Sequence, residues 1–439
     1  MGRRVVGRII LAAVTVLATA TAVQASGDAE RGVPAPEAAG PVRILLHGDS
    51  VTQGSAGDWT WRHRLWKHLV ASGEQVDFVG PRDDLRDGSR AYADPGFDRD
   101  HAARWGMSGG ALDHSVTALM AYTPDVIVDG LGVNDLRTST PETVVARAVE
   151  RVELARAVDP DVDVVLWRLP QTWRPGVAAY DDLVAQAVAA LDTPRSRVVL
   201  ADVATGFDRA RDTFDSLHPS PTGEVKIAAA VADALASLGV GTPYPRPLVT
   251  PVNGPTLVPR LTSARVDAVG TLQVGWTVPQ GATGAWVELR DVVRNGPWRR
   301  VASATTLTTA TGSATVPALV AGRRYELRVR ALKGTVASDR TSRAAAVVVP
   351  PPGRVAALRA DRRGSMARLA WTPVPRARGY EVWRRAAGTW RRVAQTQAVR
   401  LTVKQGRRTA RYRVRATGDA PGAWSVTRTV SGRAGLTRG

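Results

Sequence analysis

The sequence predicts a doubly wound α/β domain with a parallel five-stranded sheet, followed by two all-β sandwiches. Between residues 41 and 241, short apolar runs alternate with helical patterns, as in parallel strands that are joined by helices. Beyond a proline-rich linker at residues 242–256, the helical periods give way to short alternating runs, which are typical of antiparallel sandwiches. With 439 residues, the chain is long enough for several domains.

The first residues predict an export signal that precedes the fold. Three arginines within residues 1–8 are followed by an apolar run at residues 9–23 and by small residues that fit cleavage after Ala25. We expect residues 1–25 to be a signal peptide, residues 26–40 to be a linker, and the mature protein to be secreted and extracellular. No later apolar run approaches the ~20 residues that cross a bilayer.

Five apolar runs are the predicted strands of the parallel sheet: residues 42–47, 76–79, 126–131, 162–167 and 198–203. Two of the helices between and after them have clear starts, because Thr140-Pro141 and Ser220-Pro221 each place an N-cap residue before a proline. The second of these helices is expected to end at Gly239. In open parallel sheets, ligands bind beyond the carboxyl ends of the strands, so the residues after each strand are site candidates.

The all-β part divides into two similar halves. Trp276 in the first half corresponds to Trp371 in the second. In the same way, residues 286–288 correspond to residues 380–382, and residues 325–330 to residues 412–415. On these residues, both halves resemble fibronectin type III domains, which are immunoglobulin-like sandwiches. The resemblance covers residues 257–349 and 351–432.

Charge is distributed unevenly along the chain, whose formal net charge is +19. Residues 1–250 hold 25 Lys or Arg against 32 Asp or Glu, whereas residues 251–439 hold 34 against 8. For an exported protein, we expect the basic half to meet an anionic cell-wall polymer, an acidic polysaccharide or a membrane surface, and no nucleic acid. The alternative is a solvated, arginine-rich surface without a partner.

Residues that can carry chemistry follow several of the predicted strands. After the first strand, the run Gly-Asp-Ser-Val places Ser50 at the turn into a helix, where glycines allow close approach of a substrate. Asn134 follows the third strand, and Asp215 and His218 stand between the fifth strand and the last helix. The glycine-rich residues 106–110 can offer a backbone N–H. Gly-Asp-Ser alone also fits an ordinary turn, but four blocks in this order favour an acyl-transfer site.

These blocks resemble those of the SGNH, or GDSL-type, hydrolases over the whole α/β segment, and the resemblance implies a flavodoxin-like sheet. It also implies a serine esterase in which Ser50 is the nucleophile, His218 the general base and Asp215 the group that fixes the imidazole. The N–H groups of Ser50 and Gly109 and the side-chain amide of Asn134 would form the oxyanion hole. Activity should rise as His218 loses its proton.

The expected substrate is a short acyl ester, acetyl above all, on a polysaccharide. Residues 54–61 and 76–80 resemble the carbohydrate-esterase branch of the family. Trp59, Trp105 and Trp173 lie near strand ends, where their rings are candidates for stacking on sugars, with core or loop packing as the alternative. The competing hypotheses are an extracellular lipase or phospholipase of the same family and a non-catalytic cell-wall-binding protein.

Other polar residues are expected to have structural roles, and neither a cofactor nor a metal is expected. The chain has no cysteine, which excludes disulfides, thiolate metal sites and a cysteine nucleophile. Asp49 and Asp135 should hold loops. His63 and His68 are five apart on a helix and should pack or lie at the surface. The aspartates of residues 83–100 should form a solvated loop, with calcium binding as the alternative.

Overall fold

The five predicted strands form one parallel sheet in the order β2-β1-β4-β5-β6, which confirms the predicted fold class. The computed structural model describes residues 40–110, 115–249, 252–305 and 310–432. The predicted signal peptide and all but the last residue of the predicted linker at 26–40 lie outside this part of the chain. The strands are β1 (Val42–Gly48), β2 (Val76–Val79), β4 (Val126–Asp129), β5 (Asp163–Trp167) and β6 (Val198–Ala201). A two-residue strand that the sequence did not predict, β3 (Ala102–Ala103), pairs with the end of β1.

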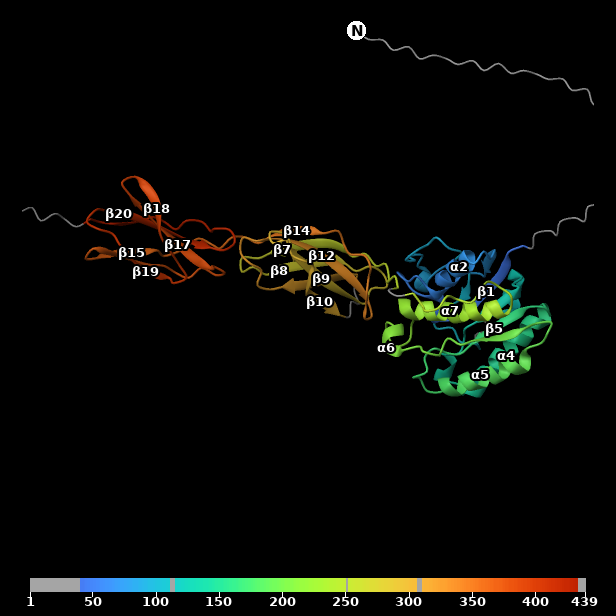
Figure 1. Cartoon of the computed structure of the whole chain (residues 1–439). Helices are drawn as coiled ribbons and strands as arrows, with labels where there is room; N and C mark the ends of the chain where they lie inside the picture. Colours follow the sequence, from blue (N-terminus) through green and yellow to red (C-terminus); the bar gives the residue numbers. More distant parts are fainter. Residues whose placement is uncertain (1–39, 111–114, 250–251, 306–309, 433–439) are drawn as a thin grey trace, which may run out of the picture. The chain divides into compact units, whose positions relative to one another are not determined.

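Helices cover both faces of this sheet (Figure 1). The long helices are α2 (Trp61–Ala71) and α7 (Pro221–Ser237) on one face and α4 (Pro141–Val158) and α5 (Val177–Leu191) on the other. The short ones are α1 (Ser50–Gln53), α3 (Val116–Leu119), α6 (Arg209–Asp212) and the 3-10 turns η1 (Arg86–Gly88), η3 (Met120–Tyr122) and η4 (Asp135–Arg137). Thr140 and Ser220 accept hydrogen bonds from the first turns of α4 and α7, so both predicted N-caps are confirmed.

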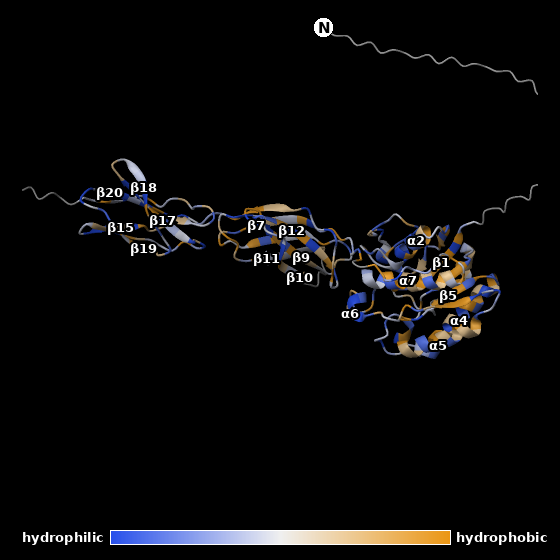
Figure 2. Cartoon of the chain, in the orientation of Figure 1, coloured by the Kyte–Doolittle hydropathy of each residue, from blue (hydrophilic) through white to orange (hydrophobic). Residues whose placement is uncertain are grey.

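Because helices cover both faces of the sheet, the side chains on both faces are buried, and the strands are therefore continuous apolar runs in the sequence. On β1, Ile44 and Leu46 face one buried cluster and Leu45 faces another. In Figure 2, orange on the ribbon of β1 and β5 marks their hydrophobic residues. The buried faces fix the register of the strands and therefore the position of the residues that follow them.

The rest of the described chain forms two antiparallel sandwiches. The first has β7 (Arg260–Val266), β8 (Leu272–Thr277) and β11 (Thr311–Val316) in one sheet and β9 (Gly284–Asp291), β10 (Arg299–Thr305), β12 (Arg324–Lys333), β13 (Val336–Ala337) and β14 (Ala345–Val348) in the other. The second has β15 (Arg359–Arg363), β16 (Met366–Ala370) and β19 (Arg400–Lys404) in one sheet and β17 (Gly379–Ala386), β18 (Thr389–Thr396), β20 (Ala410–Thr417) and β21 (Arg428–Val430) in the other. Trp276 and Trp371 each lie in the core of their own sandwich.

The predicted pairing of residues 286–288 with 380–382 is out of register by one residue. Val287 and Val382 are the equivalent residues, because both are fully buried and pair with core valines of the neighbouring strand. Tyr380 lies in the core, whereas Trp286 is half-buried beside Arg300. Alternating strands place successive side chains on opposite faces, so a one-residue slip exchanges the core and solvent faces.

The first sandwich and the segment before it are hydrogen-bonded to the α/β domain. Trp59 Nε1 donates to the carbonyl of Gly254 (2.7 Å), and the N–H of Thr256 donates to the carbonyl of Gly57 (2.9 Å). Among the described residues, no helix is both long and apolar enough to cross a membrane.

Candidate active site

Ser50 stands where β1 gives way to α1, at the carboxyl edge of the sheet. Asp49 caps this short helix through a 2.8 Å hydrogen bond from the N–H of Val51 to Oδ1. Gly48 is needed before this turn, since a Cβ there would collide with the side chain of Thr52. The turn thus fixes Ser50 in a buried position at the sheet edge.

Three residues that the sequence singled out form a continuous hydrogen-bonded chain. His218 Nε2 lies 3.0 Å from Ser50 Oγ, although the two residues are 168 positions apart. On the other side of the ring, His218 Nδ1 lies 2.6 Å from Asp215 Oδ2. Ser216, with a φ of 72°, lets the carboxylate fold back onto the imidazole within one turn. The structure therefore brings Ser50, His218 and Asp215 together.

Asp215 is held in its ionised form. Burial alone would raise its pKa. However, hydrogen bonds from the His218 ring and from the backbone N–H groups of His218 and Leu217 hold the pKa of Asp215 below its ordinary value. When the imidazole is neutral and Nδ1 carries its proton toward Asp215, the lone pair of Nε2 faces Ser50 Oγ. This arrangement can take the serine proton.

The predicted oxyanion donors are only partly placed as expected. The N–H of Gly109 donates to both carboxylate oxygens of Asp135, at 3.0 and 2.9 Å, so it does not serve an oxyanion hole in this structure. An ionised carboxylate is a stronger acceptor than a substrate carbonyl, and Arg147 holds it in place at 2.7 Å. The loop-holding role predicted for Asp135 is confirmed.

The amide of Asn134 lies between two acceptors. Its Nδ2 donates to the carbonyl of Met107 (2.9 Å) and to Oδ2 of Asp49 (3.1 Å), the residue directly before Ser50. Asp49 therefore holds both α1 and Asn134, as the sequence predicted for a loop-holding residue. Burial raises the pKa of Asp49 to about 7, the charges of Asp135 and Asp129 add to this, and the hydrogen bond from Val51 opposes it.

Aromatic rings flank the imidazole. Trp105 stacks on His218 with ring centroids 4.2 Å apart, and the ring of Phe214 lies 5.9 Å from the same imidazole. The guanidinium of Arg86 lies 4.4 Å from the centroid of Trp105. Sequence reasoning missed Phe214 and Arg86, although Phe214 directly precedes Asp215.

The other two candidate tryptophans make structural contacts away from the imidazole. Trp59 binds the carbonyl of Gly254 and packs edge-on against His63. Trp173 donates to the carbonyl of Ser216 (3.2 Å) and so supports the turn that carries the carboxylate. The packing interpretation therefore describes Trp59 and Trp173, whereas Trp105 lies at the site.

One hollow adjoins the imidazole, and a second lies beside the aromatic rings that flank it. The smaller encloses about 10 Å³ and is lined by Ser50, Val51, Gly54, Ser55, Asp58, Thr60, Trp61, Trp105, Phe214, His218, Pro219 and Glu224. The larger is an open cleft of about 520 Å³, lined by Ser55, Ala56, Arg86, Asp87, Trp105, Phe214, Asp215, Gln280, Gly281, Ala282, Thr283 and Lys333. Because Ser55, Trp105 and Phe214 line both, the cleft lies next to the small hollow beside the serine.

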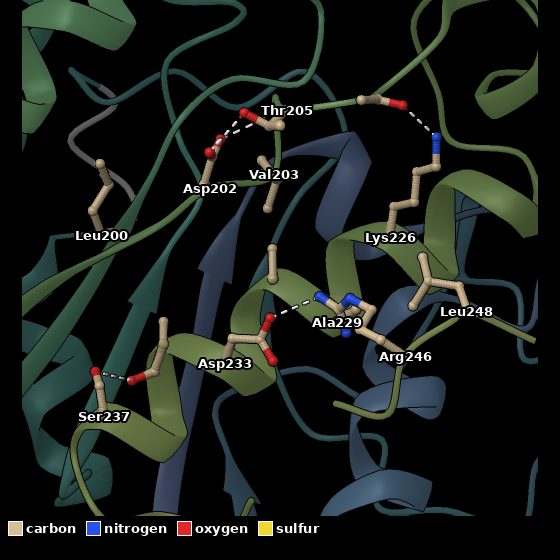
Figure 3. Close-up of a pocket in the computed structure, with 13 residues that line it drawn as sticks. Leu200, Asp202, Val203, Thr205, Lys226, Ala229, Asp233, Ser237, Arg246 and Leu248 are labelled. Carbon is tan, nitrogen blue, oxygen red and sulfur yellow. Dashed lines mark hydrogen bonds and ion pairs between the residues drawn. The ribbon is translucent and has the colours of Figure 1, made fainter. Parts of the chain in front are cut away.

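A groove of about 570 Å³ between β6 and α7 lies elsewhere (Figure 3). Its charged groups are engaged with protein partners: Lys226 with Asp212 and Arg246 with Asp233. Ser50 and His218 are not among its lining residues, so this groove is not the catalytic site.

The remaining polar candidates have structural contacts. His63 is buried against Phe97 and lies 3.1 Å from Asp94, and His68 Nε2 lies 2.7 Å from the carbonyl of Thr242. In the acidic loop, Asp83 pairs with Arg90. Within the described residues, no group of three or more His, Asp or Glu is arranged to hold a metal ion.

Comparison with known proteins finds sequence similarity over the α/β part of the chain. The sequence model of the GDSL-like Lipase/Acylhydrolase family matches residues 46–225. The chain is 26% identical, over 215 residues, to a multidomain esterase of Ruminococcus flavefaciens. That match covers 43% of this chain but only 28% of the relative, so the chain spans about a quarter of that protein's length.

Solved structures are similar to the two parts of the chain separately. A carbohydrate esterase family 3 structure from Talaromyces cellulolyticus is 27% identical to this chain, with a TM-score of 0.40. The match covers 45% of this chain and 97% of that structure's chain. A segment of two fibronectin type III domains from chicken tenascin is 16% identical and matches 39% of this chain and 98% of its own, with a TM-score of 0.29.

Proposed function

We propose that residues 46–225, which the model of the GDSL-like Lipase/Acylhydrolase family matches, form an ester-hydrolase domain. We propose further that the chain is a secreted serine esterase that removes short acyl groups, acetyl above all, from a polysaccharide. The observation that carries the proposal is the hydrogen-bonded chain from Ser50 through His218 to Asp215. The reaction needs no cofactor.

In the proposed reaction, Ser50 Oγ attacks the ester carbonyl while His218 Nε2 takes its proton. The tetrahedral intermediate collapses, the bond to the sugar oxygen breaks, and His218 returns the proton to that oxygen. Water then attacks the acyl-serine by the same route, with His218 again taking and returning one proton. Asp215 keeps Nδ1 protonated and stabilises the imidazolium in both halves.

The negative oxygen of the intermediate requires donors. We assign the N–H of Ser50 and the side-chain amide of Asn134 to this role. Because Asp49 holds one hydrogen of Asn134 Nδ2, the hydrogen that now binds the carbonyl of Met107 is the one that would turn to the oxyanion. Gly109 can contribute only if its N–H leaves Asp135.

The size of the hollow beside Ser50 supports a short acyl group. Its volume of about 10 Å³ is close to the room that a single water molecule needs, which is also the scale of an acetyl methyl group. A longer chain would have to displace Trp105 or Phe214. The adjoining cleft presents polar side chains and one indole face, which suits a hydrated sugar better than a lipid tail.

The two basic sandwiches are proposed to hold the enzyme near an anionic cell-wall polymer or acidic polysaccharide. In the second sandwich, Arg413 lies between indoles, 3.9 Å from the ring centroid of Trp424 and 4.2 Å from that of Trp390. Cosedimentation with polygalacturonic acid, lost at high salt and absent with cellulose, tests this proposal.

Four measurements test the main proposal. Ser50→Ala should abolish ester hydrolysis, and unchanged hydrolysis by this variant would exclude the assignment. Among p-nitrophenyl esters, acetate should be preferred, whereas a preference beyond ~C8 would favour the lipase hypothesis. Acetate release from a panel of acetylated polysaccharides identifies the substrate. If no ester were hydrolysed, the hypothesis of a non-catalytic cell-wall-binding protein would remain. Separately, sequencing the N-terminus of the exported protein tests cleavage after Ala25.

A further inference from the structure

The first sandwich reaches into the α/β domain through one lysine. Lys333, the last residue of β12, has a side chain that is only 3% exposed. Its ammonium binds the carboxylate of Asp58 and lies 3.4 and 3.2 Å from the carbonyls of Ser55 and Ala56. An ammonium has three hydrogens, so all three can be satisfied by the α/β domain. Burial of a lysine without such partners would be costly, which makes this a specific contact.

Lys333 contacts the loop that follows the Ser50 helix and the residue that precedes Asp215. Asp58 also accepts the N–H of Ser55 (2.8 Å), and this loop directly follows the helix that begins at Ser50. The Lys333 ammonium also lies 4.8 Å from the ring centroid of Phe214, which neighbours the imidazole of His218. One side chain of the sandwich thus links the loop after the serine to the turn that holds Asp215.

Two glycines allow this close approach. A Cβ at Gly281 would collide with the carbonyl of Ala56, and one at Gly334 would collide with that of Phe214. Both have positive φ, which other residues rarely adopt. The tips of two sandwich loops therefore touch the backbone of the α/β domain.

The same loops line the open cleft that adjoins the hollow beside Ser50. On one side lie Arg86, Asp87 and Trp105, and on the other lie Lys333 and the loop at residues 280–283. Guanidinium, carboxylate and amide groups around an indole face can bind sugar hydroxyls and stack on a sugar ring. With about 520 Å³, the cleft is in the range of small-ligand sites.

We propose that the first sandwich completes the active site, and that the cleft it forms with the α/β domain binds the saccharide that carries the ester. Gln280 is a specificity-determining residue of this cleft, and Lys333 is a positioning residue for the loop after Ser50. The proposal rests on the proposed esterase function. The sandwich is then more than a spacer, because it contributes directly to recognition of the leaving alcohol.

Substitution of Gln280 in the full chain tests saccharide binding. We expect Gln280→Ala to raise KM for acetylated cello-oligosaccharides roughly three- to tenfold, the effect of one lost hydrogen bond, and to change KM for p-nitrophenyl acetate much less, because that ester carries no sugar. The matched control is Gln397→Ala, an exposed glutamine of the second sandwich, which should alter neither substrate. Unchanged saccharide KM in Gln280→Ala, or equal changes for both substrates, would overturn the proposal.

Lys333 is tested together with its partner. Lys333→Met alone leaves the Asp58 carboxylate buried without its cation, so the double variant Lys333→Met/Asp58→Asn keeps the junction neutral. We expect it to fold, with faster hydrogen exchange over residues 54–58 and a severalfold lower kcat on both esters. Wild-type exchange and kinetics would overturn the positioning role. Absence of all ester hydrolysis in the wild-type chain would instead refute the proposed function.

Discussion

The indole of Trp105 stacks on the imidazole of His218, with ring centroids 4.2 Å apart and planes inclined by 25°. The backbone N–H of Trp105 donates to Gln53 Oε1 at 2.7 Å, and Gln53 ends the helix that begins at Ser50. The stack therefore ties the imidazole to the same element that carries the serine. It limits rotation of the ring away from Ser50 Oγ.

Removing this stack should slow the chemical step. Aromatic pairs contribute about 0.5–1.5 kcal/mol beyond buried area, which corresponds to a roughly two- to tenfold lower kcat for Trp105→Ala. Trp105→Phe keeps an aromatic face and should retain most of the activity. Steady-state kinetics with p-nitrophenyl acetate compare the two variants. A wild-type kcat in Trp105→Ala would show that the stack does not position the base.

Asn134 should act in the transition state rather than in substrate binding. Loss of one oxyanion donor costs about 10² to 10³ in kcat, so we expect Asn134→Ala to lose that much with little change in KM. Asn134→Asp preserves the shape but replaces the donor with an acceptor, and it should be equally inactive. Thermal unfolding of both variants controls for damage to the loop. Activity within threefold of wild type would remove Asn134 from the oxyanion hole.

Asp49 should make stability depend on pH between about 4 and 7. Its pKa is raised from 3.8 to about 7, so the folded chain binds this proton more tightly than the unfolded chain does. The contribution of this proton to the free energy of unfolding is fully present below pH 4 and is lost as the pH rises to 7. Above pH 7 the free energy no longer changes on account of Asp49. Compared with Asp49→Asn, the wild type should therefore lose free energy of unfolding over this range. Urea unfolding at pH 4.5, 6 and 8 measures it, and a pH-independent difference would contradict the assignment.

The catalytic chain could be predicted from sequence because its members follow strands and local turns. Ser50 and His218 are 168 residues apart, but each is placed by the register of its own strand or turn. The hydrogen bond from the N–H of Gly109 to Asp135 could not be predicted, because the sequence does not show which of two neighbouring loops supplies the acceptor for this N–H. The Lys333–Asp58 pair joins residues 275 positions apart in different domains, and strand alternation carries no signal for such a contact.

Asp215 should control which nitrogen of His218 carries the proton. Its Oδ1 accepts the N–H groups of Leu217 and His218, and its Oδ2 faces the ring nitrogen Nδ1. In Asp215→Asn, the carbonyl oxygen can keep the backbone bonds, which turns the amide hydrogens toward Nδ1. The proton then moves to Nε2 and points at Ser50 Oγ, so the ring cannot take the serine proton.

We therefore expect Asp215→Asn to lower kcat by up to ~10⁴-fold while the turn stays folded. Because the pKa of Asp215 is depressed, its stabilising contribution is present above the unfolded pKa and is lost as pH falls. The stability difference between wild type and variant should accordingly shrink in acid. Ser216→Gly, in the same turn at a φ of 72°, is the matched control and should keep full activity. If Asp215→Asn stayed within tenfold of wild type, the carboxylate would be a structural support of the turn alone.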